Sequence, residues 1–190
     1  MVADKRALRE RLLASRRARS VETRAAVADA VRDHALAHAP IARARRVALY
    51  RSMAAEPGTG PLLEALTQRG AEVWLPVVAS GHGLEWVRHD PSSPLVRSGL
   101  GIEEPQGERH GPLADLDVDV VLAPALAVDH AGHRLGRGAG YYDRALAGVT
   151  ATLIAIVHAD ELLPELPAES HDVSVSAALT EQGVFRTLAP

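Results

Sequence analysis

The stretch VDVVLAPALAV, residues 118–128, has one charged side chain, Asp119, in an otherwise apolar run. A strand that is apolar on both faces is typical of a parallel sheet with helices on its two sides. The stretch therefore predicts a buried central strand in a protein of the α/β class.

Segments on both sides of this stretch alternate between strand-like and helix-like patterns. Further strands are expected at residues 47–50, 72–78, 83–89 and 151–158, with short strand pieces in 175–187, and the third of these pairs with the second as a hairpin. Helices are expected over residues 4–19 with Asp4 as N-cap, over 21–39 closed by Pro40, over 60–70, and from 141 onward. Residues 89–116 read as a long surface connection with one short helix.

This alternation predicts a single domain over residues 1–190, a Rossmann-like three-layer α/β/α fold with a mainly parallel, mixed central sheet. The chain has no cysteine, which excludes disulfides, thiolate zinc sites and thiol catalysis. We expect no membrane-spanning helix, because no apolar run approaches roughly 18 residues, and no secretory signal. A monomeric protein of the cytoplasm is expected.

Positive charge is carried almost entirely by arginine, since Lys5 is the one lysine among 21 basic residues. A lone lysine in this background indicates a place for a compact ammonium, although chance near a tolerant terminus explains it too. Residues 4–19 are rich in arginine, which leaves RNA or a membrane surface open as a partner of this helix. The net charge of −3 argues against broad nucleic-acid binding.

The sequence HRLGRGAGYYDR, residues 133–144, follows the predicted central strand. Ligands of open α/β sheets bind beyond the carboxyl ends of the strands, where this loop is expected. Glycine permits positive φ and close approach of a ligand, and successive amides form an anion-binding nest. The loop matches neither the Walker motif nor the dinucleotide fingerprint. It predicts a phosphate cradle, with a glycine-rich turn and solvated arginines as the alternative.

Six blocks of the chain together resemble the 5-formyltetrahydrofolate cyclo-ligase family. They are DKRALRERLLASRR (4–17), YRSMAAEPGT (50–59), GIEEPQG (101–107), VLAPALAVD (121–129), DHAGHRLGRGAGYYDRAL (129–146) and HDVSVSAALTEQGV (171–184). The blocks follow the family order over nearly the whole chain. The resemblance implies an ATP- and Mg²⁺-dependent conversion of 5-formyltetrahydrofolate to 5,10-methenyltetrahydrofolate, with release of ADP and phosphate.

The resemblance also implies roles for individual residues. Arg137 and Tyr141 match catalytic positions, Met53, Glu56 and Tyr141 match folate contacts, and Asp143 and Asp172 match Mg²⁺ ligands. The residues that match ATP contacts are Lys5, Arg9, Arg134, Leu135, Gly136, Arg137, Gly138, Ala139, Gly140, Tyr141 and Tyr142. Two positions depart from the family pattern: Pro57 replaces a β-branched residue, and Ala139 replaces a lysine that some members carry.

Several other residues have a plain structural explanation. His34 and His38 have metal-binding spacing but no evident third ligand, and a solvated helix face is favoured. Trp74 and Trp86 are expected in the core rather than stacked on a pterin. His158 and Asp160 end a predicted strand at an edge of the site, and a structural role is favoured for them. His171 next to Asp172 is typical of a metal-binding pair, but Asp172 alone is favoured as ligand because Mg²⁺ prefers oxygen.

Two other functions remain open from the sequence. One is a sugar-phosphate isomerase or CoA-transferase-like enzyme, and the other is a non-catalytic nucleotide- or folate-binding module.

Overall fold

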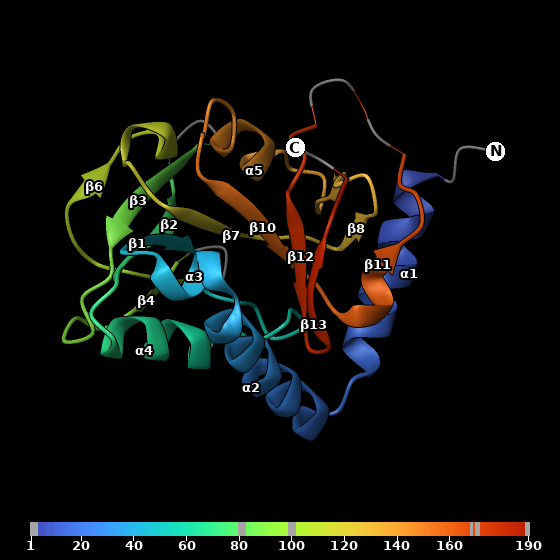
Figure 1. Cartoon of the computed structure of the whole chain (residues 1–190), viewed down its shortest axis with the longest axis horizontal. Coiled ribbons are helices and arrows are strands. Elements are labelled where there is room, and N and C mark those ends of the chain that lie inside the picture. Colours follow the sequence, from blue (N-terminus) through green and yellow to red (C-terminus); the bar gives the residue numbers. More distant parts are fainter. Residues whose placement is uncertain (1–3, 80–82, 99–101, 168, 170–171, 189–190) are drawn as a thin grey trace.

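The computed structural model describes residues 4–79, 83–98, 102–167, 169 and 172–188. An eight-stranded sheet forms its centre, in the order β13-β12-β10-β7-β1-β2-β3-β6 (Figure 1). Its strands are β1 (Arg46–Leu49), β2 (Glu72–Val78), β3 (Leu84–Arg88), β6 (Arg109–His110), β7 (Val120–Pro124), β10 (Thr152–Ile156), β12 (Ala177–Thr180) and β13 (Gly183–Arg186).

The five inner strands β2, β1, β7, β10 and β12 are mutually parallel. Strand β3 pairs antiparallel with β2, and β13 pairs antiparallel with β12, so the sheet is mixed as predicted. From β1 the chain crosses to β2, β3 and β6 on one side, and β7, β10, β12 and β13 extend the sheet on the other side of β1. The strand order therefore reverses between β1 and β7, and such a reversal opens a crevice at the carboxyl ends of these strands.

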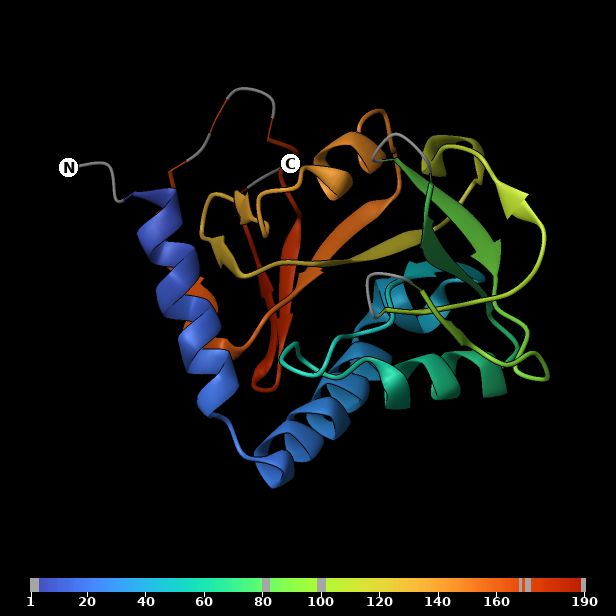
Figure 2. The same ribbon diagram turned by 180° about the vertical axis from the view of Figure 1, so that it is seen from behind.

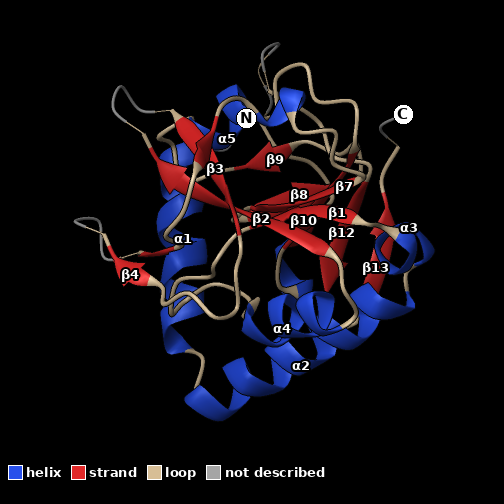
Figure 3. Cartoon of the chain, turned by 90° about the vertical axis from the view of Figure 1, so that its left-hand side faces the viewer, coloured by secondary structure: helices blue, strands red, loops and turns tan. Residues whose placement is uncertain are grey.

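One face of the sheet is covered by α2 (Val21–Ala37), α3 (Ala39–Arg43) and α4 (Gly60–Gln68), and Figure 3 shows α2 and α4 lying together below the strands. Val31, Ile41 and Leu66 from these helices are fully buried in one core cluster with the strands. The opposite face is covered by the short α5 (Tyr141–Ala145), the 3₁₀ helix η1 (Leu113–Asp115) and their connections. The predicted α/β class is confirmed, with one layer much thinner than the other.

Helix α1 (Lys5–Ala18) lies at the side of the molecule, next to β11 (Leu162–Leu163) (Figure 2). Its leucines pack with a second, three-stranded sheet formed by β11, β8 (Ala127–Asp129) and β9 (Arg134–Leu135). Asp4 caps the helix as predicted, because its side chain accepts a hydrogen bond from the amide of Arg6.

The prediction of one strand over residues 118–128 was wrong at its carboxyl end. β7 ends at Pro124 and the chain joins a different sheet at Ala127. Proline cannot donate to a strand ladder, so pairing stops there readily. Pro40 was also misassigned, since α2 ends at Ala37 and the proline lies in the first turn of α3, where its missing amide hydrogen costs nothing.

Residues 89–116 contain more structure than a surface connection. In addition to β6 and η1, they form a small ladder of β4 (Val96–Arg97) and β5 (Glu103–Glu104). The link at residues 80–82 between β2 and β3 lies outside the described residues, but the hairpin pairing itself is confirmed. In the described part of the chain, no helix has the length and apolar character needed to cross a membrane.

Candidate active site

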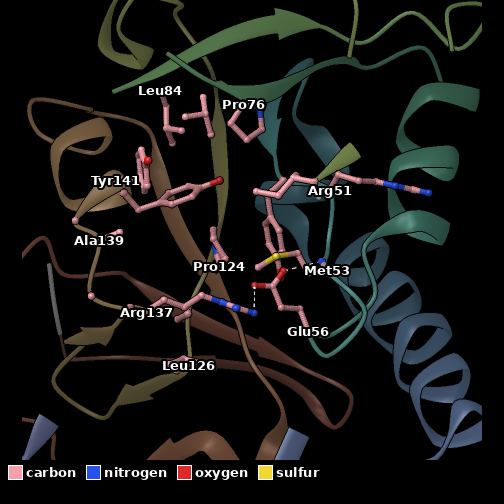
Figure 4. A pocket seen from close by; sticks show the side chains of 18 of the residues that line it. Arg51, Met53, Glu56, Pro76, Leu84, Pro124, Leu126, Arg137, Ala139 and Tyr141 are labelled. Atoms are coloured by element: carbon pink, nitrogen blue, oxygen red, sulfur yellow. Dashed lines mark hydrogen bonds and ion pairs between the residues drawn. The ribbon is translucent and has the colours of Figure 1, made fainter. Parts of the chain in front are cut away.

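A cavity of about 260 Å³ opens at the carboxyl ends of β1, β2 and β7, where the strand order reverses. Figure 4 shows its walls: Arg137 and Tyr141 on one side, Met53 and Glu56 on the other, and Pro76 and Leu84 at one end. Most of the lining is apolar, with a few converging charged groups, which is typical of a site for a small organic ligand.

The turn after β1 presents Glu56 to this cavity. The Oε2 atom of Glu56 accepts a hydrogen bond from the amide of Met53 at 2.8 Å, and the Glu56 amide donates to the Met53 carbonyl at 2.9 Å. Thr59 closes the turn, because its hydroxyl donates to the Tyr50 carbonyl at 2.7 Å. Pro57 is compatible with this geometry, and the Glu56 side chain is nearly buried, at 6% exposure.

The glycine loop between β9 and α5 forms the facing wall. Gly138 and Gly140 have φ values of 102° and 68°, which side chains rarely adopt. Gly140 is also the N-cap of α5. Arg9 from α1 reaches this loop, since its Nε donates to the Gly136 carbonyl at 2.9 Å. Arg9, which matches an ATP contact of the family, thus lies against the glycine loop.

Arg137 joins the two walls. Its Nη2 lies 3.2 Å from the Glu56 carboxylate, in an ion pair between residues 81 positions apart (Figure 4). Most residues matched to ATP thus line one cavity with those matched to folate, whereas Lys5, Arg9 and Leu135 do not line it. Tyr141 lines the same cavity, with the Arg144 guanidinium 5.6 Å from the centre of its ring.

A buried cation lies behind the loop. The Arg134 side chain is 3% exposed and forms an ion pair with Asp143. Burial lowers the pKa of Arg134, while the charges of Asp143 and Asp172 oppose this effect. Both aspartates predicted as Mg²⁺ ligands therefore act on one guanidinium.

Tyr142 lies next to this cation, with its ring centre 6.0 Å from the Arg134 guanidinium. Burial, and then the charge of Glu56, raises the pKa of the Tyr142 hydroxyl far above its ordinary value. Among the described residues its hydroxyl has no hydrogen-bond partner, and neither has that of Tyr50. Both tyrosines line the cavity and stay protonated, so the cavity contains two unused neutral hydrogen-bonding groups.

Lys5 lies at the start of α1 with two carboxylates. Its Nζ is 2.8 Å from Glu169 and 3.4 Å from Asp172. The hydrogen bond to Glu169 makes the largest contribution to raising the pKa of Lys5. The predicted ATP contact Lys5 and the predicted Mg²⁺ ligand Asp172 are thus neighbours. The described residues contain no group of three or more His, Asp or Glu side chains placed to hold a metal by themselves.

The sequence reasoning missed Arg16, which is 1% exposed and lines the cavity. One signal was present: Arg16 follows Leu8 and Leu12 at a spacing of four, on the apolar side of the helix. It also missed the wall formed by Ile102, Glu103 and Glu104, although GIEEPQG had been recognised as a block. No local pattern places that segment against β2.

Most other residues considered from the sequence lie away from the cavity. Trp74 and Trp86 are buried in the core cluster of the thin layer, as expected, and neither lines the cavity. His158 is fully buried and also lies outside the cavity lining. His34 and His38 are partly exposed at the end of α2, with no metal cluster in the described part of the chain. His171 lies outside the described residues.

Known proteins are similar to this chain in sequence and in fold. A 5-formyltetrahydrofolate cyclo-ligase from Mycolicibacterium smegmatis is 44% identical over 143 residues, covering 72% of this chain and 73% of the relative. The Escherichia coli K12 protein of the same name is 33% identical over 155 residues, covering 79% and 85%. The solved structure of Aquifex aeolicus 5,10-methenyltetrahydrofolate synthetase superposes with a TM-score of 0.83 at 32% identity, covering 98% and 93%.

The family model of 5-formyltetrahydrofolate cyclo-ligases matches residues 1–181. With a match of this extent, and with relatives above 30% identity along most of their length, the chain belongs to the 5-formyltetrahydrofolate cyclo-ligase family.

Proposed function

We propose that the chain uses ATP and Mg²⁺ to convert 5-formyltetrahydrofolate to 5,10-methenyltetrahydrofolate, releasing ADP and phosphate. Membership of the family supports the reaction. The observation that carries the assignment to this cavity is the Arg137–Glu56 pair, since it joins a phosphate-binding type of loop to a turn with an acceptor for ring N–H groups.

The chemistry needs activation of a poor leaving group. The formyl oxygen attacks the γ-phosphorus of ATP and ADP departs. N10 of the folate then attacks the formyl carbon and gives up its proton to solvent, the ring closes, and the oxygen leaves as part of inorganic phosphate. A protein nucleophile is not required, so catalysis consists of positioning and of stabilising the charge on the transferred phosphoryl group.

Glu56 and Met53 are the proposed folate-binding residues, with Tyr141 on the opposite wall of the cavity. The Glu56 carboxylate is an acceptor for N–H donors of the pterin ring. Arg137 is partly exposed and makes one ion pair, through Nη2. A guanidinium has five N–H donors, so this side chain has further donors for phosphoryl oxygens while it contacts Glu56.

The ATP phosphates fit the residues around the glycine loop. Positive φ values at Gly138 and Gly140 turn the backbone as an anion nest requires, and α5 begins immediately after. Lys5, Arg9 and Arg134 are the proposed cations, with residues 135–142 contributing backbone and ring contacts. Ala139 brings no charge to the loop, and the Arg144 guanidinium donates to its carbonyl at 3.0 Å.

Asp143 and Asp172 fit as Mg²⁺ ligands on the donor chemistry. Both are carboxylates, the ligand type that Mg²⁺ prefers, and both act electrostatically on Arg134 beside the loop. The ion would neutralise phosphate charge during transfer. Two carboxylates without a third protein ligand suit Mg²⁺, which usually keeps waters and takes substrate phosphates as ligands.

Two alternatives lose support. An isomerase or CoA-transferase-like enzyme would require no ATP, and family membership disfavours it. A non-catalytic binding module would bind ATP and folate without turnover. We also propose that the enzyme is cytoplasmic and monomeric and that it binds neither nucleic acid nor membranes.

The test mixes purified protein with 5-formyltetrahydrofolate, ATP and Mg²⁺, and follows the ultraviolet absorbance of methenyltetrahydrofolate. We expect an increase that stops when ATP is omitted or when Mg²⁺ is chelated. Product formation without ATP would contradict the proposal in favour of the isomerase-like class. Binding of both ligands without product would contradict it in favour of the binding module.

A further inference from the structure

A second cavity, of about 440 Å³, lies beside the first and shares Arg51, Met53, Ile102 and Glu103 with it. Its remaining lining is Ser52, Ala54 and Arg97. The Arg51 side chain points away from Glu56 and Arg137, toward α4 (Figure 4). Both cavities have arginines in their walls, and Arg97 is the arginine that lines the second cavity and not the first.

Arg51 is held by an exposed ion pair that a ligand can replace. The Nε of Arg51 donates to Glu103 at 3.0 Å, with the two side chains 33% and 53% exposed. An exposed ion pair with one contact contributes little to stability, typically about 0–1 kcal/mol. A ligand carboxylate can take the place of Glu103 at a guanidinium, with two parallel hydrogen bonds in place of one.

We propose that the second cavity binds the carboxylates of the glutamate tail of the folate substrate. This inference rests on the proposed function. With the pterin bound at Glu56 in the first cavity, the remainder of the folate extends along the residues that the two cavities share. Its glutamate end, which carries the carboxylates, then reaches the second cavity. The chemistry required at that end is a pair of forked cations, which Arg51 and Arg97 supply. The phosphates of ATP have their own cations at the glycine loop.

We expect Glu103 to weaken binding of the glutamate tail, whereas the two arginines strengthen it. Its carboxylate occupies the Arg51 guanidinium in the ligand-free protein, so it competes with the tail. Loss of the Glu103 charge therefore strengthens tail binding, whereas loss of either arginine weakens it. A purely structural role of the Arg51–Glu103 pair would give both substitutions the same sign.

The test compares three substrates: 5-formyltetrahydropteroate, which has no glutamate, and 5-formyltetrahydrofolate with one and with several glutamates. For Arg51→Gln and Arg97→Gln we expect KM for the glutamate-bearing substrates to rise about tenfold, as for loss of a charged hydrogen bond. KM for the pteroate form and for ATP stays unchanged. Glu103→Gln lowers KM for the glutamate-bearing substrates, about threefold.

Arg109→Gln is the matched control. Arg109 forms a similar surface pair with Glu85 at 3.1 Å and lines neither cavity. Equal losses with the pteroate form, or a similar effect in the control, would overturn the tail site. No turnover of any substrate by the unaltered protein would instead contradict the proposed function. In that case, calorimetry measures the binding of the same three compounds without ATP. Tighter binding of the glutamate-bearing compounds, lost in Arg51→Gln and Arg97→Gln, would support the tail site independently of turnover.

Discussion

Arg16 and Glu161 are 145 positions apart in the sequence and form a fully buried ion pair with two contacts. Nε and Nη2 of Arg16 donate to the two carboxylate oxygens at 2.7 and 2.8 Å. The same Nη2 donates to the Ala125 carbonyl at 2.6 Å, at the break between β7 and β8. The Glu161 carboxylate also accepts from the His158 amide at 2.8 Å. One arginine of α1, which lines the cavity, thus joins the end of β7 to the segment that follows β10.

We expect Arg16→Met to lower the free energy of unfolding by about 3–5 kcal/mol, because Glu161 would keep a buried, uncompensated charge. Adding Glu161→Met should cost less than a second loss of that size, since both charges are then gone. Arg19, whose pair with Asp160 is more exposed, is the control, and Arg19→Met should cost at most about 1 kcal/mol. Urea unfolding measures all three. An equal loss of unfolding free energy in Arg16→Met and Arg19→Met would show that burial of the Arg16–Glu161 pair does not set its contribution to stability.

Arg137→Ala and Glu56→Gln separate the two sides of the cavity. Arg137 stabilises phosphoryl transfer in the proposed function, so its loss should lower kcat by about 100-fold or more. Glu56→Gln should mainly raise KM for the folate. Arg137 is 43% exposed but its partner Glu56 is 6% exposed, so we expect the Arg137→Ala variant to fold with a slightly lower melting temperature. Steady-state kinetics give the split, and near-normal kcat in Arg137→Ala would remove the loop from the mechanism.

Lys5→Arg tests whether the lone lysine is chosen for its shape. The ammonium lies between Glu169 and Asp172, and a planar guanidinium cannot occupy the same compact position. We expect KM for ATP to rise about tenfold while KM for the folate stays the same. Lys5→Met should be at least as harmful. An unchanged KM for ATP in both variants would show that Lys5 does not contact ATP and is only a solvated residue of the helix.

His158 should make stability depend on pH. Burial, and then the charges of Arg19 and Arg16, lower the pKa of His158 from 6.5 to about 4. Between these values the unfolded chain binds more protons than the folded one, so stability is complete above about pH 6.5 and falls as the pH decreases toward 4. The slope contributed by this group is at most about 1.4 kcal/mol per pH unit.

The measurement is urea unfolding at a series of pH values, with His158→Leu as the comparison. The variant should have a flatter pH dependence in this interval, whatever its stability at neutral pH. Parallel curves for the two proteins would show that His158 is not the titrating group.

Local features of the sequence predicted most elements correctly. The cap at Asp4, the helix between Pro61 and Gly70, and the β2–β3 hairpin depend on short-range periodicity and on proline and glycine conformations. The glycine loop was also evident, because its unusual φ values at Gly138 and Gly140 require glycine at those positions. Such features depend on only a few neighbouring residues, so they can be recognised in a single sequence.

By itself, then, the sequence determined the α/β class, most of the strands and helices, and the glycine loop that we propose binds phosphate. The tertiary structure decided which groups meet: Arg137 with Glu56, Arg9 with Gly136, and Arg16 with Glu161. It also decided that residues 102–104 form a wall of the cavity. These contacts follow from strand order and helix packing. They join residues far apart in the chain, whose proximity depends on the burial of the whole core rather than on any local preference.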